Sequence, residues 1–345
     1  MKHYKHVIIG GGVLGASLAQ KLSSLGSVCL IEKNTIGSGT TSKSAGIIIE
    51  NHKTDIGTKL AEQTLLDLKT LPIDYNRVGT NPSTGVGSGW VDPYQMVQAL
   101  IQKARANSAV IKENTKVLSI NKQLFGGPRG EIREECYVVN TKQPNYTSEY
   151  RRKNKIIHPK RIVADKIYNL SGVSAQTFAS STLNVCYMRS HYWEFNGLDF
   201  ESSKPILLAP GFYVKYQKNK FEVGIQEKDS LVVDDPKDFC ENEPIDVLID
   251  AYPMLREYIN GFDNATVVSY ISGLSTYTPD GLPVIERIDP NFITVSGCNG
   301  YGITWAGGLA KAIVEGDLDT LDNNRFESGL DIKKLSQKIR HDKMK

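Results

Sequence analysis

The chain has 345 residues, of which 40% are hydrophobic and 23% are charged, and its formal net charge is +3. This length allows two domains, each with its own hydrophobic core, and the composition is ordinary for a globular protein. A net charge this small excludes nucleic acid as the expected main partner.

The five cysteines are scattered along the chain, with no CxxC pair and no paired histidines beside them. This pattern argues against a metal site and against a disulfide framework, and it favours a reducing compartment. Met1 is followed almost at once by an apolar stretch, so we expect no signal peptide, and no apolar run approaches the ~20 residues of a membrane-spanning helix. We therefore expect a cytoplasmic protein.

The first residues carry a glycine-rich turn of the kind that binds dinucleotides. An apolar strand at Val7–Ile9 leads directly into the GxGxxG pattern of residues 10–15. Gly10 allows the tight turn, Gly12 lets backbone N–H groups approach a pyrophosphate, and Gly15 lets the next helix lie close to the sheet. The pyrophosphate would then lie at the helix N-terminus, where free N–H groups and the dipole favour an anion.

The residues after the turn complete a βαβ unit. Four leucines form one apolar stripe of a helix, which Gly26 is expected to end. A second strand at Val28–Ile31 closes on Glu32, whose carboxylate can accept hydrogen bonds from ribose hydroxyls and disfavours a 2′-phosphate. NADP is therefore not expected, whereas FAD and NAD both remain open. The leucines of the stripe are Leu14, Leu18, Leu22 and Leu25.

Further elements follow in chain order. Residues 37–46 are rich in glycine and hydroxyl groups, which can donate to a phosphate or a ring system, and they end at the apolar run Ile47–Ile49. Residues 55–71 have helical periodicity. A second helix opens at Asp92, an N-cap residue followed by proline at the first helical position.

The middle of the chain is expected to be mostly strand. Segments 117–120 and 136–139 are predicted to form a small sheet, with 155–157 as a further strand, and 161–169 forms another strand that ends at residues 170–172. Alternating aromatic and polar residues at 191–195, 212–216 and 221–225 indicate an antiparallel sheet. Such a sheet would cover a substrate cavity.

The end of the chain returns to an α/β pattern. A strand at 292–295 leads into the second glycine-rich turn, residues 297–302, and a helix follows over 303–315. This second turn, together with residues 278–285, gives a site for the far end of a long cofactor. It therefore favours FAD over NAD.

This ordered combination resembles the FAD-dependent D-amino-acid oxidase superfamily, which includes glycine oxidase, sarcosine oxidase and related dehydrogenases. The resemblance implies hydride transfer from a substrate carbon to flavin N5, which gives an imine from an amine or a ketone from an alcohol. The matching segments are residues 10–15, 32–33, 37–46, 90–93, 169–172, 273–274, 278–285 and 297–302.

The resemblance also implies a set of cofactor contacts. The glycines of the first turn would face the pyrophosphate, Glu32 the ribose, and Val117 the adenine through its backbone. Thr40, Thr41 and Ser44 would lie along the pyrophosphate and flavin, and the backbone of residues 300–303 near the pyrimidine end of the flavin. The full predicted set is Gly10, Gly12, Val13, Leu14, Gly15, Glu32, Lys33, Gly39, Thr40, Thr41, Ser44, Ala45, Val117, Gly172, Gly273, Gly300, Tyr301, Gly302, Ile303 and Thr304.

Four features depart from the family pattern. Where the sarcosine oxidase branch has an arginine shortly after the hydroxyl-rich loop, this chain has Glu50, Asn51, His52 and Lys53. Ser275 stands where some relatives place a carboxylate-binding arginine. Gly273 falls about where the sarcosine oxidase branch has its covalent flavin cysteine, so we expect noncovalent FAD. Thr304 takes the place of the lysine that activates oxygen in that branch, which favours a dehydrogenase over an oxidase.

The candidates for contact with the substrate are Tyr301, His52, Arg189 and Tyr213. Tyr301 lies between the two glycines expected to approach the flavin, and His52 could serve as a base or a polar contact. Arg189 could hold a carboxylate in a bidentate fork. Tyr213 is expected to line the cavity together with Tyr192.

We thus predict an α/β fold, with a Rossmann-type FAD-binding domain and a discontinuous second domain built on an antiparallel sheet. The FAD-binding domain is expected to comprise residues 1–46, 88–182 and 266–345, and the substrate domain residues 47–87 and 183–265. The expected function is FAD-dependent oxidation of a small amine, an amino acid or N-alkyl amino acid. The alternatives are a 2-hydroxy-acid dehydrogenase and a flavin-binding subunit with a degenerate substrate site.

The remaining partners stay open at this point. Oxygen, a quinone or a carrier protein could accept the electrons, and the chain could form a homo-oligomer. The basic tail at 331–345 carries an apolar helical stripe of Ile332, Leu335 and Ile339. This tail either docks on its own domain or rests on an anionic membrane surface.

Overall fold

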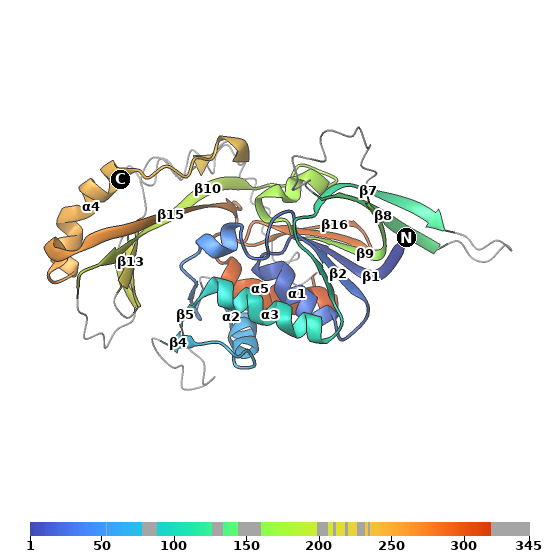
Figure 1. Cartoon of the computed structure of the whole chain (residues 1–345), viewed down its shortest axis with the longest axis horizontal. Coiled ribbons are helices and arrows are strands. Elements are labelled where there is room, and N and C mark those ends of the chain that lie inside the picture. Colours follow the sequence, from blue (N-terminus) through green and yellow to red (C-terminus); the bar gives the residue numbers. More distant parts are fainter. Residues whose placement is uncertain are drawn as a thin grey trace, which may run out of the picture.

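The computed structural model contains three β-sheets and five α-helices in its described part, and Figure 1 shows their arrangement. The structure describes residues 1–52, 54–77, 88–125, 134–143, 160–198, 206–209, 212–217, 220–225, 232–233 and 235–318. The expected strand at 155–157 and the basic tail at 331–345 lie outside these residues.

The largest sheet has eight strands, with a parallel centre in the order β17-β9-β1-β2-β6. The edge of β9 opposite β1 is shared, because its first half pairs with β8 and its last residues pair with β17. The strands are β1 (Lys2–Ile9), β2 (Val28–Ile31), β6 (Val110–Lys112), β7 (Lys116–Phe125), β8 (Glu134–Lys142), β9 (Lys160–Asn169), β16 (Val284–Asp289) and β17 (Phe292–Ser296).

Four helices pack together against one face of this sheet, and they share one hydrophobic core with it. The helices are α1 (Val13–Leu22), α2 (Asp55–Leu68), α3 (Pro93–Ala106) and α5 (Gly302–Glu315). Both α1 and α5 follow strands that are parallel to β9, so their N-termini lie at the same edge of the sheet.

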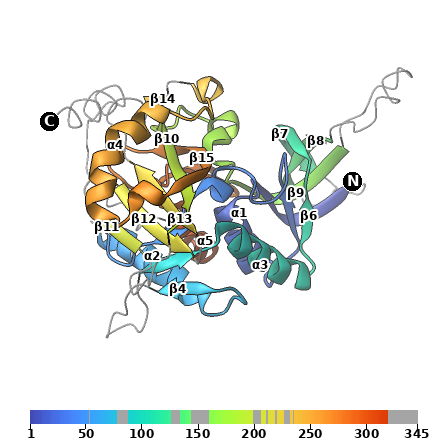
Figure 2. The same ribbon diagram turned by 60° about the vertical axis from the view of Figure 1, so that its left-hand side comes forward.

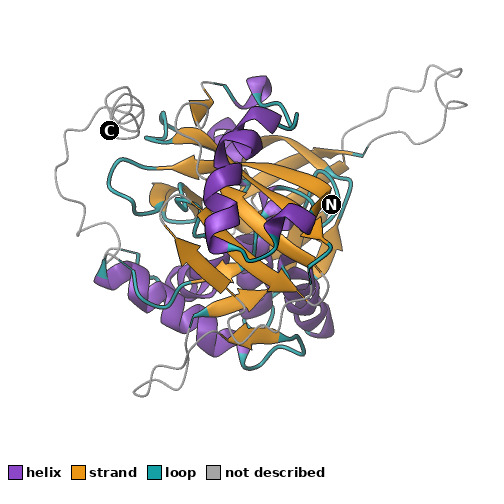
Figure 3. Ribbon diagram, turned by 90° about the vertical axis from the view of Figure 1, so that its left-hand side faces the viewer, coloured by secondary structure: helices purple, strands orange, loops and turns teal. Residues whose placement is uncertain are grey.

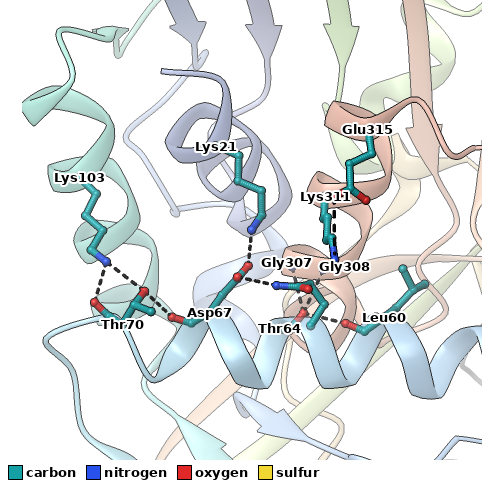
Figure 4. A network of polar contacts seen from close by, with 11 residues as sticks. Lys21, Leu60, Thr64, Asp67, Thr70, Lys103, Gly307, Gly308, Lys311 and Glu315 are labelled. Carbon is teal, nitrogen blue, oxygen red and sulfur yellow. Dashed lines mark hydrogen bonds and ion pairs between the residues drawn. The ribbon is translucent and has the colours of Figure 1, made fainter. Parts of the chain in front are cut away.

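Helix α2 crosses the other three helices and is held to each of them by polar contacts (Figure 4). Lys21 on α1 forms an ion pair with Asp67 at 2.7 Å, and Lys103 on α3 donates to the carbonyl of Thr70 at 2.6 Å. The backbone N–H of Gly307 on α5 donates to Oγ1 of Thr64 at 2.9 Å. Residues 55–68, which we assigned to the substrate domain, therefore pack with segments that we assigned to the FAD-binding domain. The domain boundaries stay a prediction.

The second sheet has six strands, and α4 (Ile245–Tyr258) lies across its outer face (Figures 2 and 3). Residues Phe212, Val214, Phe221 and Val223 alternate along neighbouring strands, and they form a buried core with α4. We call the opposite face of this sheet the inner face. The strands are β10 (Cys186–Asn196), β11 (Ile206–Ala209), β12 (Phe212–Gln217), β13 (Lys220–Ile225), β14 (Val232–Val233) and β15 (Thr266–Tyr277).

A small third sheet connects these two parts of the molecule. It has the order β3-β5-β4, with β3 at one edge. Its strands are β3 (Ile47–Ile48), β4 (Tyr75–Arg77) and β5 (Gly89–Val91), and the short 3-10 helices are η1 (Thr40–Lys43), η3 (Gly172–Phe178), η4 (Pro236–Asp238) and η5 (Phe262–Asn264).

The predicted α/β fold class is confirmed, but two local predictions were wrong. Helix α1 ends at Leu22 and not at Gly26, because Ser23 caps it with a side-chain hydrogen bond to the carbonyl of Gln20, and Leu25 is 52% exposed. Strands β7 and β8 do not form a separate small sheet, because β8 pairs with β9 and so extends the large sheet.

Within the described residues, no helix is both long enough and apolar enough to cross a membrane.

Candidate active site

Three glycines of the turn between β1 and α1 lie in different surroundings. Gly10 has φ +105, and a Cβ on it would lie 2.4 Å from the carbonyl oxygen of Leu170. A Cβ on Gly15 would lie 2.0 Å from the carbonyl oxygen of Gly10, so the helix approaches the turn backbone to backbone. Gly12 differs, because its φ of −73 suits any residue and a Cβ there would contact only Oγ1 of Thr41, at 3.1 Å.

The N-terminus of α1 has no side-chain cap from its N-cap residue, Gly12. The N–H of Val13 donates to Oγ1 of Thr41, and the N–H groups that follow it in the first turn face the space beside Gly12, where the helix dipole favours an anion. A glycine at this position keeps that space clear, and this is an observation that fits a pyrophosphate.

Glu32 lies beside the same turn. One oxygen of its carboxylate accepts a hydrogen bond from the N–H of Gly11 and the other from the N–H of Asn34, both at 2.8 Å. The neighbouring Lys33 donates to Oγ of Ser174, in the segment that follows β9, at 3.3 Å. Glu32 and Lys33 are therefore positioned on the side of the turn where the predicted ribose contact would lie.

The hydroxyl-rich residues 40–44 lie against both the turn and the six-stranded sheet. Oγ1 of Thr41 accepts from the N–H of Val13 at 3.1 Å, at the start of α1. The hydroxyl of Thr40 donates to the carbonyl of Leu274 on β15 at 2.7 Å. The hydroxyl-rich segment is thus held in place between the two larger sheets, and a Cβ on the neighbouring Gly39 would meet nothing within 4 Å.

The next residues are the short edge strand β3 and the residues on either side of it. The carbonyl of Gly46 accepts from Val91 on β5 at 3.1 Å, whereas the carbonyls of Ala45, Ile47 and Ile49 accept from side chains outside β5. We call these three groups the edge carbonyls. Each accepts a side-chain hydrogen bond: Ala45 from Lys215 at 2.7 Å, Ile47 from Thr304 at 3.3 Å and Ile49 from His52 at 2.9 Å.

The second glycine-rich turn leads into α5. Its backbone bends at Gly300, which has φ +79, and Tyr301 is the N-cap residue of the helix without a capping side chain. Asn299 stabilises the turn, because its Oδ1 accepts from the N–H of Thr278 at 2.8 Å and its Nδ2 donates to the carbonyl of Gly297 at 2.6 Å. The late motif thus forms a second uncapped helix N-terminus at the same edge of the sheet as the first.

Three aromatic residues meet at this second N-terminus. The ring of His52 packs edge-on against Tyr301, with centroids 4.7 Å apart, and lies 5.4 Å from the ring of Trp305. Burial lowers the pKa of His52, so its imidazole is neutral at pH 7. Because Nε2 donates to the carbonyl of Ile49, Nδ1 carries the lone pair that could accept a proton or a hydrogen bond.

The inner face of the six-stranded sheet carries buried charges that lie in one row across the strands. Glu194, Glu222 and Lys215 are paired neighbours on β10, β13 and β12. Lys215 Nζ is 2.6 Å from Glu222 Oε1, and both side chains are nearly inaccessible, at 2% and 7% exposure. Burial lowers the pKa of Lys215 and raises the pKa of Glu222, while each charge favours the ionised form of the other.

Tyr213 lies on the same inner face, in the next row. Its cross-strand partner is Gly224, where a Cβ would lie 1.9 Å from the tyrosine ring. The missing side chain at Gly224 therefore makes room for this ring. Burial raises the pKa of Tyr213 well above its usual value, and the nearby charges of Glu222 and Tyr192 act in the same direction.

The structure does not bring every predicted residue to one place. Arg189 lies on the outer face, where it donates to the carbonyl of Cys240 at 2.8 Å and stacks near the ring of Phe239. Val117 is buried on β7 among apolar residues of the large sheet. Gly172 has φ +59 and open space around it, and Gly273 lies on β15 against the side chain of Lys43.

Among the described residues, one group has the composition of a metal site. His3, Cys136 and Asp165 have ligand atoms within 4.8 Å of one another, and His3 forms a hydrogen bond to Asp165. The group lies near the start of β1, whereas the glycine-rich turn follows the end of that strand. It is therefore separate from the site described above.

Sequence reasoning missed Lys215, Glu222 and Trp305. A signal for the first two was present, because each of the segments 212–216 and 221–225 contains one charged residue among residues that form the core. Such charges belong on the inner face if the strands are paired, but the pairing could not be known from the sequence alone.

Taken together, a parallel sheet, two uncapped helix N-termini at one of its edges and a segment that connects them define a dinucleotide-binding oxidoreductase fold with a covering antiparallel sheet. Residues 5–86 and 85–316 match the model of the DAO family, described as FAD-dependent oxidoreductases. The chain belongs to this family, and FAD is its cofactor. The predicted resemblance is thereby confirmed.

The chain is similar to several characterised proteins. It is 24% identical to human mitochondrial dimethylglycine dehydrogenase over 407 residues, a match that covers 93% of the chain but only 44% of the relative. The chain thus spans less than half the length of this relative. Among solved structures, L-proline dehydrogenase from P. horikoshii has a TM-score of 0.69 at 16% identity, covering 97% of this chain and 98% of the other. The FAD-bound L-α-glycerophosphate oxidase of Mycoplasma pneumoniae has a TM-score of 0.67 at 18% identity, with 91% and 94% covered.

The residues of both glycine-rich turns fit FAD. Gly12 leaves open space at the N-terminus of α1, Glu32 lies on the ribose side of that turn, and the backbone of Gly300 and Tyr301 precedes the uncapped N-terminus of α5. Which individual residues contact the cofactor stays a prediction.

Proposed function

We propose that this protein oxidises a small amine, an amino acid or N-alkyl amino acid, and passes the electrons to an acceptor other than oxygen. The observation that carries the proposal is the ring of His52 packed against Tyr301, at the helix N-terminus expected to hold the flavin, where burial lowers the pKa of the imidazole and so favours its neutral form. Two of the similar proteins, dimethylglycine dehydrogenase and L-proline dehydrogenase, are dehydrogenases of amines, and this similarity supports an amine substrate here.

FAD, when bound, takes up the hydride that leaves the substrate carbon, and the chain has to position that carbon. An amine must be in its neutral form to give up the hydride. His52 offers the unprotonated Nδ1 as an acceptor for an amine N–H, and Tyr301 at the N-cap of α5 can contact the substrate from the same side. Tyr213 on the inner face is the third group proposed to line the cavity.

A 2-hydroxy acid is the main alternative substrate, and the glycerophosphate oxidase is a specific reason to test it. An alcohol needs a base to remove its proton as the hydride leaves, whereas a neutral amine does not. We therefore expect His52→Leu to keep a substantial part of the activity toward the amine. If a 2-hydroxy acid is the substrate, His52→Leu should lower kcat toward that acid by about 100-fold or more, the lower part of the range for general base catalysis.

The choice of acceptor can be measured directly. Thr304, at the position where some relatives carry an oxygen-activating lysine, hydrogen bonds to the carbonyl of Ile47. We expect fast substrate-dependent reduction of an artificial dye and slow formation of hydrogen peroxide in air. Hydrogen peroxide formation as fast as dye reduction would instead identify an oxidase.

The second alternative is a flavin-binding subunit without a working substrate site. It predicts that the dye is not reduced with any small amine or hydroxy acid. We also propose that FAD is held noncovalently, so acid precipitation should leave the yellow colour in the supernatant, and colour in the pellet would contradict this. The cytoplasmic location, an electron-carrying partner and homo-oligomer formation remain proposals that these measurements do not address.

A further inference from the structure

Lys215 is the charged member of the three side chains that bind the edge carbonyls. Its ammonium group is 2.6 Å from Glu222 Oε1, 2.7 Å from the carbonyl oxygen of Ala45 and 5.1 Å from the ring centroid of Trp90. Burying an ammonium group is unfavourable unless it is paired and hydrogen bonded. All these partners are therefore needed to keep Lys215 in its buried position.

Ala45 lies in the middle of the segment that connects the two helix N-termini. On one side, Thr41 contacts the first residue of α1, and on the other side, Ile47 accepts from Thr304 in the first turn of α5. The backbone next to Ala45 cannot easily shift toward β5, because a Cβ on Gly46 would lie 1.9 Å from the carbonyl oxygen of Val91. Lys215 therefore holds this segment from the side of the six-stranded sheet.

We propose that Lys215 is a positioning residue for FAD: it links the inner face to Ala45 and so fixes the segment along which the cofactor lies. Glu222 keeps the ammonium group charged and directed at Ala45. The inference rests on the FAD site and not on the proposed substrate, since the effect concerns cofactor binding before any turnover.

A single substitution cannot separate this role from simple stability. Lys215→Met would leave the Glu222 carboxylate buried without its cation, and breaking one half of a buried pair is strongly destabilising. Replacing both partners by apolar residues is often neutral for folding. The double variant Lys215→Met/Glu222→Leu therefore removes the link to Ala45 without leaving an unpaired buried charge.

The experiment compares the thermal midpoint of the apo-protein, the Kd for FAD and the visible absorption spectrum of the bound flavin. For the double variant we expect a thermal midpoint near that of the wild type, a shifted flavin spectrum and FAD binding weakened about tenfold or more, because a hydrogen bond from a charged donor is lost. A wild-type Kd together with a wild-type spectrum would overturn the proposal.

Two further variants complete the test. In Glu222→Gln the ammonium group loses its counter-charge but keeps an amide oxygen as an acceptor, so part of its contact with Ala45 should remain. FAD binding should therefore weaken less than in the double variant, and an equal loss would overturn the role of Ala45. Lys220→Met removes an exposed lysine from the same strand pair and is the matched control, with unchanged Kd expected. If the double variant does not fold, Lys215→Gln/Glu222→Gln replaces it under the same criteria.

Discussion

At the scale of single residues, the glycines of the first turn have different physical reasons for being there. Gly15 is required by the fold, because any side chain would meet the backbone of Gly10 at 2.0 Å. Gly12 is not required by the fold, since its backbone angles are ordinary and its surroundings are open. A glycine at this position instead keeps space for the anion that we expect at the N-terminus of α1.

This difference gives a prediction for two variants. Gly12→Val should abolish FAD binding, and it should lower the free energy of unfolding of the apo-protein less than Gly15→Ala does, because its Cβ would meet only Oγ1 of Thr41, at 3.1 Å. Gly15→Ala should lower the free energy of unfolding by about 1–3 kcal/mol, because the helix must move away from the turn. Chemical denaturation and FAD titration measure both effects. Wild-type FAD affinity in Gly12→Val would show that the pyrophosphate lies elsewhere.

The roles of some residues could be predicted from the sequence because these residues belong to one local structure, formed by segments that are close along the chain. The glycine-rich turn, Glu32 and the hydroxyl-rich segment could be found because their spacing along the chain reflects one local structure. Lys215 could not be assigned, since its partner Ala45 is 170 residues away and the contact depends on how two sheets meet. For the same reason, the outer-face position of Arg189 could not be foreseen without the strand pairing.

At the scale of elements, the contact between α2 and α5 is a close helix crossing built on small residues. A Cβ on Gly308 would lie 2.5 Å from the Cα of Leu60, and Thr64 fills the gap beside Gly307 with a hydrogen bond (Figure 4). This crossing supports α5, whose N-terminus carries Tyr301 and Thr304.

We expect Gly308→Ala to lower the free energy of unfolding by about 1–3 kcal/mol, because overpacking outweighs the better helix propensity of alanine. Thermal or urea denaturation measures the change. Lys311→Ala, on the exposed side of the same helix, is the control and should stay within about 0.5 kcal/mol of the wild type. A Gly308→Ala variant as stable as wild type would contradict the tight crossing.

Most elements were predictable from periodicity and capping residues, and the errors have local causes. Asp92 does cap α3, since its carboxylate accepts from the N–H of Gln95 at 2.9 Å. The end of α1 was predicted at Gly26, but the side-chain hydrogen bond from Ser23 to the carbonyl of Gln20 ends the helix three residues before that glycine. The β7–β8 hairpin is part of the large sheet because β17 pairs only with the last residues of β9. The first half of β9 pairs with β8 instead.

At the scale of the whole molecule, two buried histidines make folding sensitive to acid. Burial lowers the pKa of His6 to about 4 and the pKa of His191 to about 4. Both are neutral in the folded state at pH values where the unfolded chain, with a usual pKa near 6.5, already binds protons. Their contribution to stability is thus complete above pH 6.5 and is lost as the pH falls toward 4.

We predict that the free energy of unfolding falls by about 2 kcal/mol per histidine between pH 6.5 and pH 5. His6→Phe should make this slope shallower by about half of the histidine contribution, whatever its effect at neutral pH. Urea denaturation at a series of pH values provides the measurement. An unchanged slope in His6→Phe would show that His6 is not kept neutral by burial.

The arrangement of the molecule brings the first and the second glycine-rich turns to one site. Segment 40–49 touches α1 through Thr41, the six-stranded sheet through Ala45 and α5 through Ile47. The cofactor identity follows from this arrangement and from the family. The side chains that we propose for contact with the substrate, such as His52 and Tyr301, come together only in the folded chain.

The central claim, amine oxidation at this site, is tested most directly by mixing the FAD-loaded protein with substrates in the absence of oxygen. The loss of visible flavin absorbance is followed for amino acids, N-methyl amino acids and 2-hydroxy acids, with dithionite as the control for a reducible flavin. We predict that at least one amino acid or N-methyl amino acid bleaches the flavin completely and that the hydroxy acids do not. Bleaching by hydroxy acids alone, or by none of the compounds while dithionite still reduces the flavin, would contradict the account.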